Sequence, residues 1–545
     1  MSDKYTTKAY LLNVPLENDY KNTLYFTSKA EQEAYFKSRK VFTYDDFSYQ
    51  RKDEPVRIGE FDSNGKESNY DDLIKEGVNY VMYQNSHYTD KWFYAFITDI
   101  KYISDGLVEI YLETDVIQSW LFDFNVKASF VEREHVSDDT IGKHTVPENL
   151  ETGEYISNGN SDVDMGKMYI VVGTTQAYET KEKGGLYGGC YSGVHYLVWE
   201  LDDYSGVNHF LNYMDEGGYA DAISSVFLLP EFVVKDILDE ESNVLNGTKI
   251  ASQTEKLVVK NIPSADTSGT LDGYFPSNMK LFTYPYNYLL ASNNVGGSAI
   301  YRYEHFKTTR EGFENDCLFN MYGVVCPGGS IKLVPKQYKG VTENLEESLN
   351  AGKFPICNWN TDVYTNWLTQ NGVNIALSIA SGGLQMAGGA ALMATGGGAM
   401  AGAGSIASGG LSIAQTLGQI YQQSLVPPQA EGNINCGDVL RGINKNTFTF
   451  YKMSIKAEYA RILDQYFNMF GYRVNMVKVP NKAHRARWWY TKTIDVNIDG
   501  AIPNKDMQKI KDCYNKGITY WRNANEIQNY SLGNIISITN GAVTE

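Results

Sequence analysis

The N-terminal part of the chain alternates apolar and polar residues and is rich in aromatic and β-branched side chains. Residues 91–100 and 107–114 show this pattern clearly, and the Ser-Asp-Gly sequence at residues 104–106 is typical of a turn. We therefore predict a β-hairpin at this place. Similar alternation predicts strands joined by polar turns over the whole stretch up to about Val136.

The middle of the chain has a mixed pattern. Polar residues 137–160 predict a loop, whereas the apolar runs at residues 168–173 and 194–199 predict strands. Apolar residues at helical spacing predict a helix over residues 230–246. A short helix is also predicted over residues 342–352, where a glycine ends the apolar pattern.

Two helices are predicted in the C-terminal part. The second covers residues 504–516 and is followed by Gly517. Ser454 can cap the first helix, which ends at Gly471. The apolar face of this first helix consists of Ile455, Tyr459, Ile462, Leu463, Phe467 and Phe470.

One long stretch, Val363 to Ala430, contains no Lys, Arg, Asp, Glu or His and differs from the rest of the chain. Three glycines at residues 396–398 separate two arms, residues 375–395 and 399–420. A helix that spans a bilayer needs about 20 apolar residues, and each arm has that length. The glycines lower helix propensity by about 1 kcal/mol each, so neither arm resembles a conventional membrane anchor.

Small residues recur at four-residue spacing in both arms, which lets helices approach closely in a membrane. We therefore interpret this stretch as a marginally lipophilic, membrane-active segment that inserts as an assembly of copies. The alternative is a flexible Gly/Ala-rich linker, but a linker rarely carries so many apolar residues. The residues that we expect to act in the membrane are Ile375, Leu377, Ile379, Leu384, Met386, Ala387, Ala391, Leu392, Met393, Ala399, Ala403, Ile406, Ala407, Leu411, Ile413, Leu417 and Ile420.

The composition limits the classes of function. The formal net charge of −17 argues against nucleic-acid binding through a broadly basic surface, yet an acidic wall can conduct DNA without trapping it. The 41 Tyr, 23 Phe and 8 Trp residues favour strands. The six cysteines form no Cys-x-x-Cys pair, so free thiols in a reducing cytoplasm are expected. The first residues lack the apolar core of a secretory signal, and we expect none.

A basic stretch interrupts this acidic chain. Residues 465–494 contain no Asp or Glu. Three roles are open for its cations: contact with phosphate, a solvated face, or ion pairs with acids of a neighbouring subunit. The cations are Arg473, Lys478, Lys482, Arg485, Arg487 and Lys492.

The sequence offers little for catalysis. None of the seven histidines has a metal-binding spacing, and no phosphate-binding loop, dinucleotide fingerprint or Gly-x-Ser-x-Gly elbow is present. Cys190, five residues before His195, is the best nucleophile, but catalytic pairs usually come from distant segments. Asp162 and Asp164 could bind a cation, although solvent exposure explains them equally well. We predict no enzyme activity, no metal and no cofactor.

Several short stretches resemble the tail knob, or distal tail tube, proteins of small protein-primed podophages of Gram-positive bacteria, the picovirus group. Their order, with the apolar block at the corresponding place, makes the match specific at both ends of the chain, whereas residues 142–354 match poorly. The stretches are Asn18–Thr23, Phe26–Ser28, Lys91–Phe96, Asp115–Trp120, Phe130–Val136, Lys456–Tyr459, Gly471–Tyr472, Gly517–Thr519 with Trp521, and Asn529–Ser531.

The resemblance implies a mainly β fold with minor α content, in which tail-tube or hub-like β-barrel domains assemble into a hexameric tube. The expected domains are an N-terminal tube domain (1–136), a β-rich knob region with short helices (137–360), the apolar loop (361–432) and an α+β segment that completes the tube (433–545).

The resemblance also implies a function at the tip of a short noncontractile tail. Six apolar loops plug the tube before infection, and then form a channel in the host cytoplasmic membrane through which double-stranded DNA passes without sequence recognition. The implied partners are the other copies of a homohexamer, the upstream tail tube or collar, and other tail proteins of the virion. The alternatives are a purely structural adhesin or spacer without pore activity, and a tail-associated cell-wall hydrolase.

Overall fold

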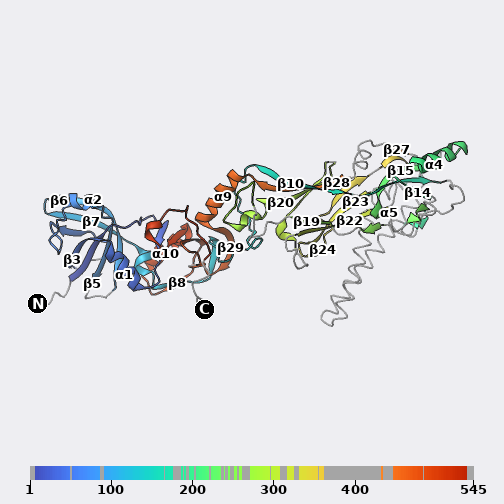
Figure 1. The fold of residues 1–545 in the computed structure, drawn as a ribbon. Helices are drawn as coiled ribbons and strands as arrows, with labels where there is room; N and C mark the ends of the chain where they lie inside the picture. The colour runs from blue at the N-terminus through green and yellow to red at the C-terminus, as the bar shows by residue number, and fades with distance from the viewer. Residues whose placement is uncertain are drawn as a thin grey trace, which may run out of the picture. The chain divides into compact units, whose positions relative to one another are not determined.

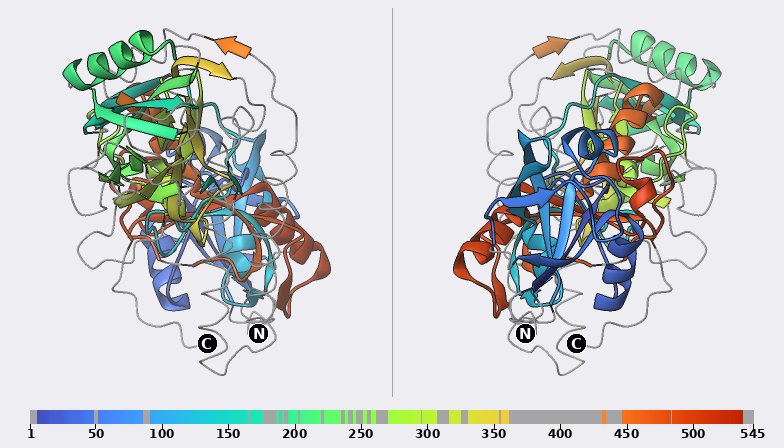
Figure 2. Two further views of the ribbon diagram at one scale, coloured as in Figure 1. Left: turned by 90° about the vertical axis from the view of Figure 1, so that its right-hand side faces the viewer. Right: turned by 90° about the vertical axis from the view of Figure 1, so that its left-hand side faces the viewer.

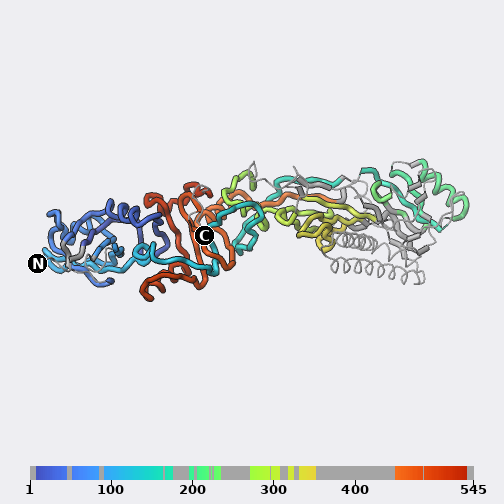
Figure 3. The backbone as a smooth tube through the Cα atoms, turned by 90° about the horizontal axis from the view of Figure 1, so that it is seen from below, coloured from blue at the N-terminus to red at the C-terminus, as the bar shows by residue number. Residues whose placement is uncertain are grey.

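The computed structural model forms two compact units, which are described separately. Unit 1 comprises residues 1–151, 276–280 and 460–545, and unit 2 comprises residues 152–275 and 281–459. Both ends of the chain therefore contribute to unit 1, coloured blue to cyan and orange to red in Figure 3. The structure describes residues 6–536 apart from 49–51, 86–90, 165, 176–185, 188–189, 192–194, 202–203, 220–221, 235–237, 240–243, 246–250, 254–256, 261–269, 295, 307–315, 325–329, 354, 361–430, 434–445 and 483.

Strands predominate in unit 1, where short helices connect them (Figure 1). Its strands are β1 (Thr6–Leu12), β2 (Asn22–Leu24), β3 (Lys40–Ser48), β4 (Val56–Gly59), β5 (Tyr80–Asn85), β6 (Phe93–Ser104), β7 (Leu107–Thr114), β8 (Phe124–Val126), β9 (Ser129–Glu134), β29 (Tyr472–Lys478), β30 (Trp488–Ile494), β31 (Ile498–Gly500) and β32 (Ile518–Trp521). Its helices are α1 (Lys29–Ser38), α2 (Tyr70–Lys75), α3 (Val116–Trp120), α10 (Asn504–Lys516) and the 3₁₀ helix η4 (Ala524–Glu526). Two elements belong in part to each unit, α9 (Ala457–Phe470) and η2 (Met279–Phe282).

Two main sheets build unit 1. The first is antiparallel, in the order β3-β1-β5-β6-β7-β4. The second has the order β2-β32-β30-β9-β29, so it joins strands from the two ends of the sequence. The predicted hairpin is confirmed, because β6 and β7 pair antiparallel across the turn at Asp105 and Gly106.

Aromatic side chains fill the core between these elements. Trp488 and Trp521 are fully buried, and their ring centroids lie 4.8 Å apart. Phe36 from α1 stacks on Tyr80 at 5.4 Å and contacts Tyr94 at 4.6 Å. The helix α1 thus contributes to the same hydrophobic cluster as the C-terminal strands.

The two C-terminal helices were predicted with different accuracy. The predicted helix at residues 504–516 is confirmed as α10. The other helix, α9, ends before Gly471 as predicted but begins at Ala457, so the proposed cap at Ser454 is wrong. Ser454 is buried in a strand instead, and the carboxylate of Asp272 accepts the Ala457 N–H at 3.1 Å.

Unit 2 is also built mainly from strands. They are β10 (Tyr155–Asp164), β11 (Met168–Thr174), β12 (Leu186–Tyr187), β13 (Cys190–Tyr191), β14 (His195–Glu200), β15 (Ile223–Pro230), β16 (Leu238–Asp239), β17 (Val244–Leu245), β18 (Ala251–Gln253), β19 (Leu257–Lys260), β20 (Asn287–Ser292), β21 (Ser298–Tyr301), β22 (Asp316–Val324), β23 (Ser330–Tyr338), β24 (Val341–Glu343), β25 (Leu349–Lys353), β26 (Pro355–Asn360), β27 (Glu431–Asn433) and β28 (Asn446–Ile455). Its helices are α4 (Tyr204–Glu216), α5 (Glu231–Val234) and η3 (Tyr303–His305).

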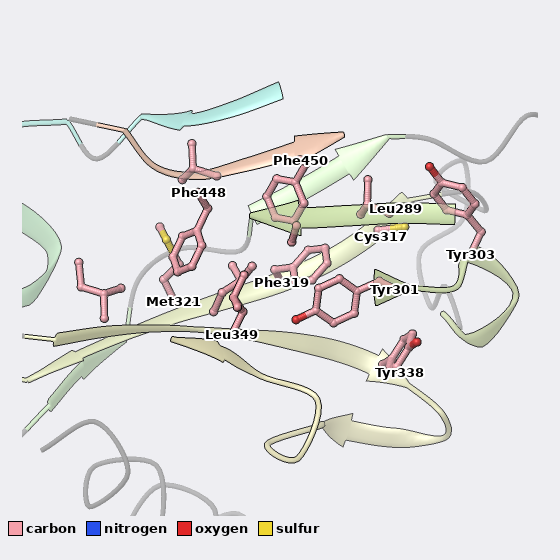
Figure 4. Close-up of a cluster of buried hydrophobic side chains, with 14 of the residues drawn as sticks. Leu289, Tyr301, Tyr303, Cys317, Phe319, Met321, Tyr338, Leu349, Phe448 and Phe450 are labelled. Carbon is pink, nitrogen blue, oxygen red and sulfur yellow. The ribbon is translucent and has the colours of Figure 1, made fainter. Parts of the chain in front are cut away.

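Three sheets organise unit 2. The largest has the order β16-β17-β14-β11-β15-β26-β27. A four-stranded sheet, β10-β28-β20-β21, and a six-stranded sheet around β22 and β23 contribute to one core. Figure 4 shows Phe450 of the four-stranded sheet pointing toward Phe319 of the six-stranded sheet, and the two rings lie 5.0 Å apart.

Two predicted helices are wrong. Among the described residues of 230–246, only those of the four-residue α5 are helical; β16 and β17 follow, and Val244 of β17 pairs with Leu197 of β14. In residues 342–352 the structure has β24 and β25, and Leu349 pairs with Leu333 of β23. In both places an available neighbouring strand overrides a weak helical spacing.

The mainly β fold with minor α content is therefore confirmed. The strands predicted at residues 168–173 and 194–199 correspond to β11 and β14, which pair antiparallel. The predicted loop ends at β10, which begins at Tyr155. The hexamer and the division into four domains stay predictions.

Candidate functional site

The apolar insert begins and ends at two paired strands of unit 2. Asn360, the last residue of β26, lies opposite Glu431, the first residue of β27, and Asn358 lies opposite Asn433. Figure 2 shows the two strands side by side, β26 in yellow and β27 in orange. Because residues opposite each other in antiparallel strands are about 5 Å apart, residues 361–430 leave and re-enter the sheet at one place.

This strand pair lies at one end of the seven-stranded sheet. β26 pairs with β15, which pairs with β11, and β27 is the terminal strand. Side chains of this sheet are deeply buried: Val171, Leu197, Leu228 and Leu229 are at most 1% exposed. Helix α4 packs Phe210 against Trp199 at 5.2 Å. The strands that flank the insert thus belong to a sheet with a packed hydrophobic interior.

All candidate plug and membrane residues, from Ile375 to Ile420, lie outside the described residues. The same holds for the small-residue stripes and for the prolines at 427 and 428. Among the helices that the structure describes, none is long and apolar enough to cross a membrane. The proposed membrane segments are therefore still predictions from sequence.

A buried ionic cluster organises unit 1. The side chain of Glu148 is 1% exposed, and its carboxylate forms ion pairs with Arg133 and Lys280. It also accepts a hydrogen bond from the backbone N–H of Arg473 at 2.9 Å. Arg133 also donates to the carbonyl of Gly471 at 2.7 Å. Burial lowers the pKa of Lys280, although Glu148 opposes this effect. The cluster fixes how three stretches of unit 1 that are distant in sequence meet.

Half of the six cations in the basic stretch at residues 465–494 form ion pairs within unit 1. Lys478 pairs with Glu134, which is buried, and Arg487 pairs with Glu526. Lys492 pairs with Glu132 at 2.8 Å. These three cations therefore have intramolecular partners. The other three cations have no carboxylate within ion-pair distance among the described residues; they are Arg473, Lys482 and Arg485.

The groups that most resemble catalytic residues have structural roles. His135 is buried, accepts the Tyr490 N–H at its Nδ1 atom and donates from Nε2 to the Asn468 carbonyl; burial lowers its pKa to about 3. The Asp115 carboxylate caps α3 and accepts the Tyr80 hydroxyl, and burial raises its pKa to about 6. Burial likewise raises the pKa of the Cys513 thiol to about 12, which disfavours the reactive thiolate.

The other candidates from the sequence are no better supported. Cys190 lies in β13 and His195 begins β14, but their side chains are outside the described ones. Asp162 is exposed and accepts a hydrogen bond from Thr449. No group of three or more His, Cys, Asp or Glu residues able to hold a metal ion occurs in the described part of the chain.

One cavity in unit 1 was not indicated by any sequence signal. It has a volume of about 280 Å³ and is lined by aromatic residues such as Tyr25, Phe124 and Trp489, together with Asn125 and Lys482. Trp489 stacks on Tyr520 with centroids 5.4 Å apart. These rings pack mainly against each other and in the hydrophobic core, and Trp489 and Tyr520 are at most 4% exposed. We assign the cavity no function.

Comparison with known proteins defines the class. Residues 4–125 match the family described as caudoviral major tail protein N-terminus. Residues 252–535 match the family described as Bacillus phage phi29, tail knob protein gp9, C-terminal domain. The β-rich fold and these two matches define a bacteriophage tail protein. Since the second match covers more than half of the 545 residues, the chain belongs to the phi29 gp9 tail knob protein family.

Individual relatives agree over almost the full length. The tail knob protein gp9 of Bacillus phage PZA is 27% identical, with 97% of this chain and 98% of that protein covered. The gp9 protein of Bacillus phage phi29 is 26% identical, again with 97% and 98% covered. The resemblance to tail knob proteins is confirmed.

One solved structure shares the fold. The bacteriophage C1 tail knob protein gp12 superposes with a TM-score of 0.60, covering 97% of this chain and 100% of that chain. Since the two sequences are 15% identical, this likeness concerns the fold alone.

Proposed function

We propose that this tail knob protein forms a homohexameric distal tube through which double-stranded viral DNA leaves the virion. The apolar loop at residues 361–432 plugs the lumen before infection and then forms a channel in the host cytoplasmic membrane. The protein is made in the host cytoplasm, is carried at the tail tip, and contacts the upstream tail tube or collar and other tail proteins.

The pairing of β26 with β27 carries this proposal. Because both ends of the insert are fixed at one place in the sheet, the insert can change its environment while the sheet keeps its hydrogen bonds. A stored segment that is later displaced needs this kind of attachment. A membrane anchor resident throughout the life of the protein has no such requirement.

The charge distribution also supports storage. An uncharged apolar insert of this length would promote aggregation on the surface of a single copy. Six inserts gathered in a tube lumen are removed from water, and the net charge of −17 keeps the assembly soluble. Beside a bilayer, the inserts can satisfy their backbone groups as helices, and the small-residue stripes favour helix bundles.

A deletion that uses the strand register tests the proposal. Residues 361–430 are replaced by Asn-Gly, which closes β26 and β27 with a two-residue hairpin turn. The variant should keep the fold and assembly of the wild type but lose the ability to release dye from liposomes. If wild type never leaks liposomes at any pH, and virions that carry the deletion still eject DNA, the pore proposal fails.

Two single substitutions test the helix-bundle version of the channel. Ala387→Lys and Ala403→Lys each place a charge at bilayer depth, which costs about 2.5–3.5 kcal/mol on insertion scales. Assembly should be largely unchanged, whereas leakage should be blocked. Leakage at the wild-type rate by both variants would contradict a bundle of these arms.

The lumen offers a further test. We expect it to be lined mainly by acidic or neutral polar groups, which do not trap phosphate. A map of the assembled tube with Arg473, Lys482 and Arg487 ringing the lumen would contradict this expectation.

The rival functions predict different results. A structural adhesin or spacer without pore activity predicts DNA ejection by the deletion variant. A cell-wall hydrolase predicts a cleared zymogram that Cys190→Ala abolishes.

A further inference from the structure

The edge strand β29 exposes apolar side chains. It lies at the end of the five-stranded sheet and pairs with β9 alone among the described strands. Met476 is 51% exposed and Val477 is 69% exposed, and Val479, just after the strand, is 52% exposed. Natural edge strands usually carry charges or prolines that prevent pairing with another chain. The one lysine here, Lys478, pairs with buried Glu134 and gives little such protection.

The apolar surface continues from this edge across the sheet. Val477 lies opposite Phe130 of β9, and Phe130 lies opposite Ile494 of β30. Residues in direct register point to the same face, so these three side chains form one row. Phe130 is 37% exposed and Ile494 is 54% exposed. Contiguous exposed apolar patches of this kind mark interaction surfaces.

The charges around the row favour a second copy of this chain as its partner. Each copy carries a net charge of −17, so two copies repel each other over most of their surfaces. Residues 465–494, which supply β29 and β30, contain no acid. Lys492 of β30 forms an ion pair with Glu132, and the guanidinium of Arg473 donates to the Pro147 carbonyl at 3.5 Å. The β29 edge is therefore neutral to basic on an acidic molecule, and it suits the acidic surface of another copy.

The composition of the row agrees with such a contact. The cores of interfaces between identical subunits are more apolar than the average protein surface and are depleted in charge. We propose that the β29 patch, which we define as Phe130, Val477, Val479 and Ile494, is the contact surface for a neighbouring copy in the ring. This inference rests on the proposed hexamer. Ring contacts are heterologous, so the patch packs against a different surface of the neighbour.

A matched pair of substitutions in the full-length chain tests this inference. Ile494→Glu introduces a charge into the patch, whereas Ile74→Glu introduces the same charge in α2, at a residue that is 55% exposed against 54% for Ile494. Assembly is followed by analytical ultracentrifugation over a range of protein concentrations. Wild type and Ile74→Glu should form the six-copy species. Ile494→Glu and Val477→Glu should lose it at concentrations where wild type is fully assembled, because an interface cannot solvate the carboxylate.

Three outcomes would overturn the inference. Assembly of Ile494→Glu and Val477→Glu at the wild-type concentration would move the contact elsewhere while leaving the hexamer intact. Equal loss of assembly by Ile74→Glu would show that the effect of an added charge is not specific to the β29 patch. Wild type that stays monomeric at every concentration would contradict the proposed hexamer as well.

Hydrogen exchange on wild type gives a readout that does not depend on any variant. The amides of Met476, Val477 and Val479 should exchange more slowly in the assembled protein than in the dilute one, because a neighbouring copy covers them. Equal exchange in the two states would overturn the inference, even if the variants fail to fold.

Discussion

The two units of this protein stabilise their interiors in different ways. All the buried charged residues among those that the structure describes lie in unit 1; they are Asp62, Asp115, Arg133, Glu134, Glu148, Lys280, Asp464, Arg485 and Asp506. In the described part of unit 2, the buried polar residues are uncharged, namely Thr174, Thr283, Asn287, Asn293, Asn320, Asn344, Thr449 and Ser454.

The difference follows the way in which the chain builds each unit. Unit 1 assembles three separate stretches of sequence, and its buried charges connect them: Glu148 binds Lys280 of the middle stretch, and Asp464 accepts hydrogen bonds from Ser277 and Asn278. Aromatic packing around Phe319 dominates the main core of unit 2. We interpret the ionic contacts as determinants of how distant segments meet, which apolar contacts alone specify less well.

The largest effect is expected from Glu148→Ala. This substitution leaves Arg133 and Lys280 buried without their shared carboxylate. Breaking a buried ion pair by removing one partner costs about 3–5 kcal/mol. Chemical denaturation should show this loss, and hydrogen exchange should place it in β9 and β29 rather than in β22 and β23.

An exposed pair in unit 2 supplies the control. Glu347 pairs with Lys339, but both side chains are more than one third exposed. Glu347→Ala should therefore cost less than about 1 kcal/mol. Equal losses of unfolding free energy for Glu148→Ala and Glu347→Ala would contradict a larger contribution of the buried cluster to stability.

A smaller effect is expected from Gly471→Ala in unit 1. Gly471 has a φ of +63°, and an added Cβ would lie 2.1 Å from the Glu134 carbonyl oxygen. Gly340 in unit 2 has a φ of +78° and open space around it. Gly340→Ala therefore measures only the cost of a positive φ for alanine, without a steric clash. We expect about 1–2 kcal/mol for Gly340→Ala and about 1–2 kcal/mol more for Gly471→Ala. Equal losses in thermal unfolding would mean that β9 moves to accommodate the methyl group.

The sequence predicted best where local signals agree with tertiary pairing. The β6–β7 hairpin and α10 each have a clear period and a turn or glycine at the end, and both were found at the predicted place. Residues 230–246 and 342–352 have a helical spacing but form strands with β14 and β23. Periodicity within one segment carries no information about such distant partners.

The candidate site was likewise predicted only in part from the sequence. Composition alone identified the insert at residues 363–430, but its most informative feature, the register of Asn360 with Glu431, joins residues on either side of it. The Glu148 cluster was missed because its members come from distant stretches. Absence of acids from residues 465–494 was visible in the sequence, whereas the internal partners of Lys478 and Lys492 required the fold.

The buried charges of unit 1 also predict a pH dependence. The pKa of His135 falls to about 3 by burial, so its contribution to stability is present above its ordinary pKa of 6.5 and is lost as the pH falls toward 3. The pKa of Asp115 rises by burial to about 6 from 3.8, so its contribution is present below pH 3.8 and is lost as the pH rises through 6. Between pH 6 and about 4 the two effects oppose each other.

Asp115→Asn removes one of these opposing effects and keeps a side chain that can cap α3. Between pH 6 and 4 the variant should lose stability about 1.4 kcal/mol per pH unit more steeply than wild type. Denaturant titrations at several pH values measure this slope. The exposed residue Asp99, with a side chain 57% exposed, supplies the control, and Asp99→Asn should follow the wild-type slope. Parallel curves for wild type and Asp115→Asn would contradict the assignment.

The smallest effect compares one substitution in both units. Tyr301→Phe in unit 2 removes a hydroxyl that donates to the Glu347 carbonyl at 2.7 Å, a neutral hydrogen bond that contributes about 1 kcal/mol. Tyr80→Phe in unit 1 removes a hydroxyl that donates to the Asp115 carboxylate at 2.8 Å. At pH 8 that carboxylate is ionised, and a hydrogen bond to a charged group contributes about 1.5–3 kcal/mol. The difference in unfolding free energy between the two variants should therefore shrink below pH 5, where Asp115 is protonated. A difference that is the same at pH 8 and pH 5 would mean that charge does not distinguish the two cores at these sites.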